Sequence, residues 1–197
     1  MGTLLENVML RSSLIVLLLA FSAAASAEDF DYTYFNVGYG TVELDDVDVD
    51  GDGFTIGGAF ALADKYHVFL DYDMASLDFD VDATQWRAGF GYNTMLSDTV
   101  GAYARLSYEY VEVDVGGVGS ADDNGYGFGV GLRFHATSAL ELHGGLQYRD
   151  LSDSGDDTGF NLGGLYSFTD AFALGLAGSW DDDFTSYRLT GRFYFGQ

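Results

Sequence analysis

The segment Gly125-Tyr-Gly-Phe-Gly-Val-Gly-Leu-Arg-Phe-His135 decides the fold of this chain, because large apolar residues alternate along it with small or polar ones. Successive side chains of a strand point to opposite faces, so one face carries only apolar side chains and the other carries glycine, Arg133 and His135. A soluble sheet rarely places Arg and His on its inner face. A barrel in lipid fits the pattern, because its apolar face points outward and its polar face lines the interior.

The same alternation recurs along the rest of the chain and predicts ten strands. The expected strands are 32–42, 53–62, 66–77, 84–93, 100–111, 125–135, 140–150, 158–168, 171–180 and 184–195. Nearly every outward set ends in an aromatic residue, as expected where strands cross the two membrane interfaces. The sequence therefore predicts an all-β fold, a single antiparallel transmembrane β-barrel of ten strands.

The connections between these segments alternate in character. One set consists of tight turns rich in Asp, Ser and Thr. The other set is acidic and is expected to form the longer, extracellular loops: 43–52, 78–82, 112–124, 150–157 and 181–183. An even number of strands then places both ends of the mature chain on the periplasmic side.

Composition sets further bounds on the fold and its partners. The 197 residues are 48% hydrophobic and 16% aromatic, which excludes a disordered acidic chain despite a net charge of -23. That charge also excludes nucleic acid as a partner. There is no Cys and no Pro, so disulfides and thiolate metal sites are absent and every strand residue can donate to a ladder.

The N-terminus has the pattern of a secretion signal. Arg11 precedes an apolar run over 14–21, and the small residues Ala25-Ser-Ala27 follow as a cleavage site. The run is shorter than the roughly 20 residues of a spanning helix. We therefore expect residues 1–27 to be a signal peptide and 28–197 to be the mature barrel, with translation starting at Met1 or Met9.

The basic residues of the mature chain are distributed unevenly between the two faces of the strands. Apart from Lys65 in a turn, all of them have the inward parity: Arg87, Arg105, Arg133, Arg149, Arg188 and Arg192. A lipid-facing Arg costs about 2 to 4 kcal/mol at the bilayer midplane, so the lumen is the favourable location. Four carboxylates share this parity, namely Asp71, Asp73, Glu109 and Glu141. The pattern predicts a narrow lumen packed with ion pairs, including a contact between Arg133 and Glu141 across their tight turn.

The first acidic connection resembles part of a calcium loop. Asp46-Val-Asp-Val-Asp-Gly51 matches the first six positions, but the twelfth falls on Gly57 instead of Glu, and strands flank the segment. A solvated acidic loop is the favoured interpretation. Asp46, Asp48, Asp50 and Asp52 are then expected to make only weak contacts with divalent cations.

Two other groups of residues suggest catalytic or metal chemistry. His67, His135 and His143 face inward near the periplasmic end, where pairing with carboxylates is the commoner role of a histidine. Asp71 and Asp73 resemble an acid/base pair, but the histidines lie toward the opposite end. We therefore expect no catalytic residue, no bound metal and no cofactor.

Three stretches carry a resemblance to a known family. Asp31-Tyr-Thr-Tyr-Phe-Asn-Val-Gly-Tyr-Gly40, Asp48-Val-Asp-Gly-Asp-Gly-Phe54 and Gln85-Trp-Arg-Ala-Gly-Phe-Gly-Tyr92 resemble the small outer-membrane β-barrel family that includes the activator-of-immunity proteins of plant-associated bacteria. The resemblance implies an outer-membrane barrel of Gram-negative cells that also leaves in vesicles and is sensed by a host or acts as a signalling surface protein. It brings no catalytic residue.

The C-terminus resembles the signal that the barrel-assembly machinery reads. Tyr187, Leu189, Phe193 and Phe195 occupy alternate positions, although the chain ends in Gly196-Gln197 instead of an aromatic residue.

Two functions remain open, and an enzyme is the least supported class. The first is a closed, monomeric barrel with a structural or surface-interaction role, whose acidic loops meet outer-membrane lipid and lipopolysaccharide through divalent cations. The alternative is a small passive pore for ions or small solutes. The many inward glycines motivate the pore, because glycine leaves room for water.

Overall fold

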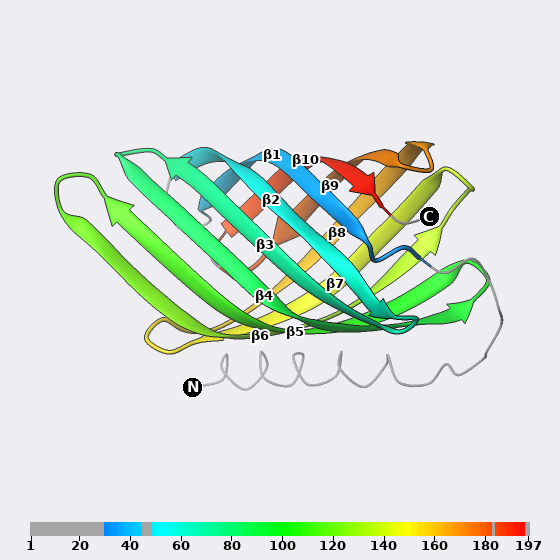
Figure 1. Cartoon of the computed structure of the whole chain (residues 1–197). Helices are drawn as coiled ribbons and strands as arrows, with labels where there is room; N and C mark the ends of the chain where they lie inside the picture. Colours follow the sequence, from blue (N-terminus) through cyan, green and yellow to red (C-terminus); the bar gives the residue numbers. More distant parts are fainter. Residues whose placement is uncertain (1–29, 45–48, 183, 196–197) are drawn as a thin grey trace, which may run out of the picture.

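A computed structural model describes residues 30–44, 49–182 and 184–195, which form a closed antiparallel barrel (Figure 1). Its strands are β1 (Tyr34–Leu44), β2 (Val49–Ala63), β3 (Tyr66–Leu77), β4 (Val81–Ser97), β5 (Val100–Val115), β6 (Gly119–His135), β7 (Leu140–Leu151), β8 (Gly155–Thr169), β9 (Phe172–Trp180) and β10 (Phe184–Tyr194). Each strand pairs with the next, and β10 pairs with β1 to close the ring. The predicted fold class is confirmed.

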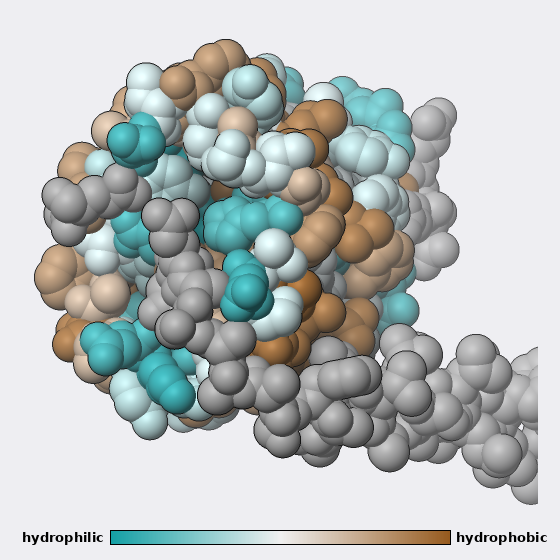
Figure 2. Space-filling view, turned by 90° about the vertical axis from the view of Figure 1, so that its right-hand side faces the viewer, coloured by the Kyte–Doolittle hydropathy of each residue, from teal (hydrophilic) through white to brown (hydrophobic). Residues whose placement is uncertain are grey.

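The two faces of the strands follow the predicted parity through the middle of the barrel. Outward side chains such as Phe90 and Leu106 are more than 60% exposed, whereas inward Arg133 is 5% exposed. Figure 2 views the barrel from the end where β10 ends and shows hydrophobic residues around much of the side, with hydrophilic residues near the middle and at several points of the rim. In a membrane the outward residues face lipid, so their exposure is what a transmembrane barrel requires.

Among the described residues, no helix is both long enough and apolar enough to cross a membrane. The expected signal peptide, residues 1–27, lies outside the described residues. So do Asp46 and Asp48 of the first acidic connection, while Asp50 and Asp52 belong to β2.

The prediction that the acidic connections form long loops is wrong for the described residues. The strands continue into them and end in short turns, at 78–80 between β3 and β4, 116–118 between β5 and β6, and 152–154 between β7 and β8. The reason is that alternation does not stop there but changes phase. In β5, Val111, Val113 and Val115 point inward while Glu112 and Asp114 point outward, and β-branched valine favours the extended conformation.

At these strand ends the apolar side chains point inward, opposite to their direction in the rest of the barrel. We define the rim hairpins as residues 76–84 at the β3–β4 turn and 111–122 at the β5–β6 turn. The β5–β6 hairpin reaches the far left of Figure 1. Their outward side chains are acidic or carry a hydroxyl group, and their inward side chains are mostly apolar. This is the polarity of a soluble sheet and the reverse of that in the membrane-spanning band.

Candidate functional site: the barrel interior

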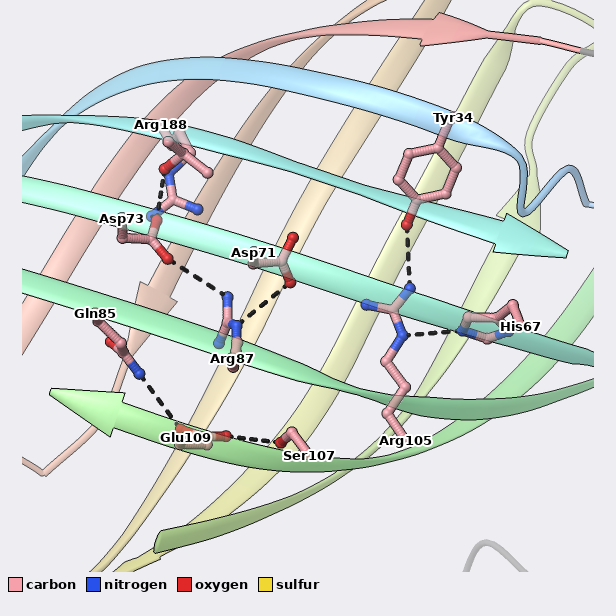
Figure 3. A network of polar contacts seen from close by, with 11 residues as sticks. Tyr34, His67, Asp71, Asp73, Gln85, Arg87, Arg105, Ser107, Glu109 and Arg188 are labelled. Atoms are coloured by element: carbon pink, nitrogen blue, oxygen red, sulfur yellow. Dashed lines mark hydrogen bonds and ion pairs between the residues drawn. The ribbon is translucent and has the colours of Figure 1, made fainter. Parts of the chain in front are cut away.

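The middle of the lumen is crossed by an ion-pair network that joins β3, β4 and β10 (Figure 3). Arg87 Nε lies 3.4 Å from Asp71 Oδ2, and its Nη2 lies 4.0 Å from Asp73 Oδ2. Arg188 Nη2 lies 2.9 Å from Asp73 Oδ1. The register explains the first contact, because Asp71 and Arg87 are direct cross-strand partners. Arg188 reaches Asp73 from the opposite side of the β1–β2 hairpin, so the network ties the closing seam to β3.

Glu109 is held by neutral donors. Ser107 Oγ donates to its Oε1 at 2.9 Å, and Gln85 Nε2 donates to its Oε2 at 3.3 Å. Within the described part of the chain no arginine lies at ion-pair distance from Glu109, although the shared parity had suggested one. The carboxylate is nevertheless buried, with 6% of the residue exposed. Gln85 and Ser107 are polar residues of the lumen that sequence reasoning missed.

Arg105 and Arg192 are also satisfied without carboxylates among the described residues. Arg105 donates from Nε to His67 Nε2 at 3.2 Å and from Nη2 to the Tyr34 hydroxyl at 3.1 Å. Arg192 donates from Nε to Asn36 Oδ1 at 2.9 Å, and its guanidinium lies 3.9 Å from the Tyr34 ring centroid. Tyr34 therefore binds one arginine through its hydroxyl and the other through its ring face, a cation–π contact.

The strongest ion pair lies near the end of the barrel where β1 begins and β10 ends. Arg133 and Glu141 form a bidentate pair with both N–O distances at 2.8 Å. They flank the turn between β6 and β7, where the sequence had placed them together. Their side chains are only 6% and 9% exposed, so the two charges are held in a largely dry environment.

The segment before β1 closes this end of the lumen. We call residues Phe30–Thr33 the N-terminal plug. Arg133 Nη1 donates to the Asp31 carbonyl at 3.1 Å, and its guanidinium lies 4.6 Å from the Phe30 ring and 4.8 Å from the Tyr32 ring. Phe30 and Tyr32 are 4% and 5% exposed. Both aromatic rings are therefore held inside the barrel against the guanidinium of Arg133.

The three histidines serve the plug and the lumen wall. Tyr32 stacks on His67 at 4.4 Å, and Phe30 stacks on His135 at 4.0 Å. His67 also contacts Asn93 through Nδ1 at 3.1 Å and is fully buried. His143 lies over Gly163, where a Cβ atom would meet its ring. Within the described ranges, no group of three His, Cys, Asp or Glu residues is arranged to hold a metal ion.

The inward glycines provide room for these large side chains. At Gly91 a Cβ atom would collide with the ring of His67, and at Gly131 with Tyr103. Gly127 lies against the Glu109 carboxylate in the same way. The space left by these glycines is therefore filled by neighbouring side chains, whereas Gly129 has only the Leu146 carbonyl within 4 Å, at 3.7 Å.

The end of the barrel that carries the acidic turns is called the acidic end. There the last of the predicted lumen arginines, Arg149, pairs with a neighbouring strand. Arg149 Nη2 lies 2.8 Å from Asp157 Oδ2. Asp123 accepts hydrogen bonds from the backbone N–H groups of Asp153 and Ser154 and from the Ser154 hydroxyl, so it fastens the β7–β8 turn to β6. Asp52 accepts from the Tyr39 hydroxyl at 2.7 Å, and both Asp50 and Asp52 are exposed on the outward face of β2.

The closed ring, the apolar outward band and the charged interior define a transmembrane β-barrel of the outer-membrane class. Residues 13–168 match the family model of the outer membrane protein beta-barrel domain, and the chain belongs to that family. No curated protein matches the chain.

Solved structures of similar shape come from several outer-membrane proteins. The translocator domain of the autotransporter NalP from Neisseria meningitidis is 12% identical, with a TM-score of 0.50 over 98% of this chain and 97% of its own. The attachment invasion locus protein Ail of Yersinia pestis is 15% identical, with a TM-score of 0.44 over 83% and 97%. The KdgM porin is 13% identical, with a TM-score of 0.44 over 82% and 99%. At these identities the likeness concerns the fold alone.

Proposed function

We propose that this outer-membrane barrel is closed and acts through its structure and its external surface, not by conducting solutes. The observation that carries the proposal is the filled interior. The Arg87–Asp71–Asp73–Arg188 network spans its middle, and the N-terminal plug, clamped by Arg133, covers the end where β1 begins. An ion crossing the lumen would have to break these contacts, and each buried group left without its partner is costly.

A small passive pore is the second candidate, and one observation favours it. Gly129 faces inward with little around it, so the interior retains some free space on the β6 side. Arg105 and Arg192 lack carboxylate partners among the described residues, and such a pore would favour anions. The space is local, because Tyr103 covers the neighbouring Gly131.

Conductance in planar bilayers separates the two candidates. We expect the purified, folded full chain to show no steady single-channel steps over a wide range of voltage. A variant with Phe30 and Tyr32 both changed to alanine removes the aromatic side chains of the plug and serves as a check that rare openings are detectable. Steady steps from the unaltered protein would overturn the closed-barrel proposal and support the pore.

Several partners follow from this function as proposals. The barrel-assembly machinery inserts the chain, lipid and lipopolysaccharide surround it as a monomer, and divalent cations relieve the repulsion between the acidic rim and anionic lipid. The narrower resemblance to activator-of-immunity proteins, with release in vesicles, agrees with a role at the cell surface. No catalytic group is part of the proposal.

A further inference from the structure

The rim hairpins carry apolar side chains that the barrel itself does not cover. Phe79 at the β3–β4 turn is 79% exposed, and Val118 at the β5–β6 turn is 85% exposed. The inward valines beneath the tips, among them Val113, stay partly exposed as well. These residues lie beyond the aromatic band, so neither the bilayer nor the barrel core accounts for them.

The two tips lie side by side and form one surface. The backbone N–H of Gly116 donates to the Asp80 carbonyl at 2.8 Å, which joins the β5–β6 turn to the β3–β4 turn. Val81 and Val115 are direct cross-strand partners just below. Phe79 and Val118 therefore project from adjacent turns, and we call this surface, residues 78–82 and 113–118, the tip patch.

The backbone conformation at Phe79 disfavours an aromatic side chain, so the geometry of the turn does not explain why phenylalanine is found there. Phe79 and Asp80 both have positive φ, 65° and 57°. Glycine or asparagine adopts this conformation readily, whereas a bulky aromatic does so rarely. Phe79 is thus unfavourable both for the backbone and for contact with water, and an exposed residue of this kind points to a contact with another molecule.

The charge around the tip patch restricts what that molecule can be. Its exposed charged residues are all acidic, namely Asp78, Asp80, Asp82 and Asp114. At this end of the barrel the only described basic residue is Arg149, which is paired with Asp157. Anionic partners are repelled, and a complementary partner must supply both basic and apolar side chains.

We propose that the tip patch docks a cationic amphipathic segment of another protein or peptide. This inference rests on the proposed surface role and names its partner class. Phe79 and Val118 insert among the apolar residues of the segment, and the surrounding carboxylates pair with its lysines or arginines. The apolar contact selects against partners that carry charge alone.

The test uses the full chain folded in nanodiscs of zwitterionic lipid, with empty discs as the background. The probe is a labelled synthetic helix of lysine and leucine with an apolar face, and its binding is followed by fluorescence anisotropy. A second probe replaces leucine by serine at equal charge. We expect the first to bind at least about tenfold more tightly than the second, a ratio equivalent to about 1.4 kcal/mol.

Two variants on different turns test the surface itself. Phe79→Asn keeps a residue that tolerates positive φ, and Val118→Ser leaves its neighbouring glycines unchanged. Each should weaken binding of the lysine–leucine probe by about tenfold while the gel migration of the folded barrel stays the same. Asp80→Asn should weaken it less at high salt than at low salt, and Asp98→Asn, at the opposite end, should have no effect.

The outcomes separate this inference from the proposed function. Equal binding of the two probes, or unchanged binding by both Phe79→Asn and Val118→Ser, overturns the docking inference and leaves a closed barrel intact. A conducting barrel overturns the proposed function whatever the peptide does.

Discussion

Replacing Arg133 with leucine tests how the lumen is held together. Arg133 makes a bidentate pair with Glu141 at 2.8 Å, donates to the Asp31 carbonyl and lies over the rings of Phe30 and Tyr32. In Arg133→Leu the buried Glu141 loses its partner. Breaking a buried pair from one side costs about 3 to 5 kcal/mol.

The plug contacts add to this loss. Each cation–π contact of Arg133 contributes about 0.5 to 2 kcal/mol, depending on how dry it is. We therefore expect Arg133→Leu to lower the free energy of unfolding by at least about 3 kcal/mol. Urea unfolding of the barrel in lipid vesicles, followed by tryptophan fluorescence, measures the change. Lys65→Leu is the matched control, because Lys65 lies exposed in the β2–β3 turn, and it should change stability little.

A double variant distinguishes loss of the pair from loss of packing. In Arg133→Leu/Glu141→Leu no buried charge is left alone, and such replacements are often neutral or stabilising. The double variant should therefore recover most of the stability that the single variant loses, except for the part that came from the plug. Equal stability of Arg133→Leu and Lys65→Leu, or a double variant as unstable as Arg133→Leu, would refute the reasoning.

Three further predictions concern the glycines, the acidic end and the barrel as a whole. Gly131→Ala should destabilise the barrel by about 1 to 3 kcal/mol, because the added Cβ would meet Tyr103 and the Gly144 carbonyl. Gly129→Ala on the same strand should be tolerated. Urea unfolding of both variants measures the difference. Calorimetry at low ionic strength should show weak, salt-dependent binding of Ca²⁺ at several sites, including Asp50 and Asp52, and a single tight site would contradict it. The folded protein should migrate differently on a gel before and after heating in detergent, and a mature chain soluble as a monomer without detergent would contradict a transmembrane barrel.

The part of the fold that follows from local alternation could be predicted from sequence. The side-chain period of a strand is two. Once a single residue such as Phe90 is known to face lipid, the face of each remaining residue in its strand is therefore also known. This is why the inward position of Arg87 and the contact between Arg133 and Glu141 followed from counting alone. The expected strand 66–77 also has the bounds of β3, because a tight turn precedes it.

The acidic end could not be predicted in the same way, because the expectation treated runs of aspartate as loops. Asp and Glu are poor strand formers in general. When they occupy only every second position, however, the residues between them determine whether the segment forms a strand. In β5 those residues are Val111, Val113 and Val115, and cross-strand pairing with β4 continues as far as Val81. The change of phase from apolar-out to apolar-in was present in the sequence and marks the point where the strands leave the membrane.

The N-terminal plug shows why contacts between distant segments escape sequence reasoning even when parity is known. Phe30, Tyr32 and Tyr34 share one parity, and that parity is inward, so extending the phase of β1 backwards already sends three aromatic rings into the lumen. Nothing in the local sequence shows which residue they meet, because the Asp31 carbonyl and Arg133 are 102 positions apart. Closure of the barrel determines which residue these rings contact. The ring brings β6 across the opening from β1, and the guanidinium of Arg133 is then the group that can bind Glu141 in its plane and two aromatic rings on its faces. Lysine at the same position would keep the charge but lose the planar, bidentate geometry, so Arg133→Lys should release the plug while retaining part of the contact with Glu141. Proteolysis of the N-terminal segment in the folded barrel would detect that release, and equal protection in both proteins would show that burial alone holds the plug.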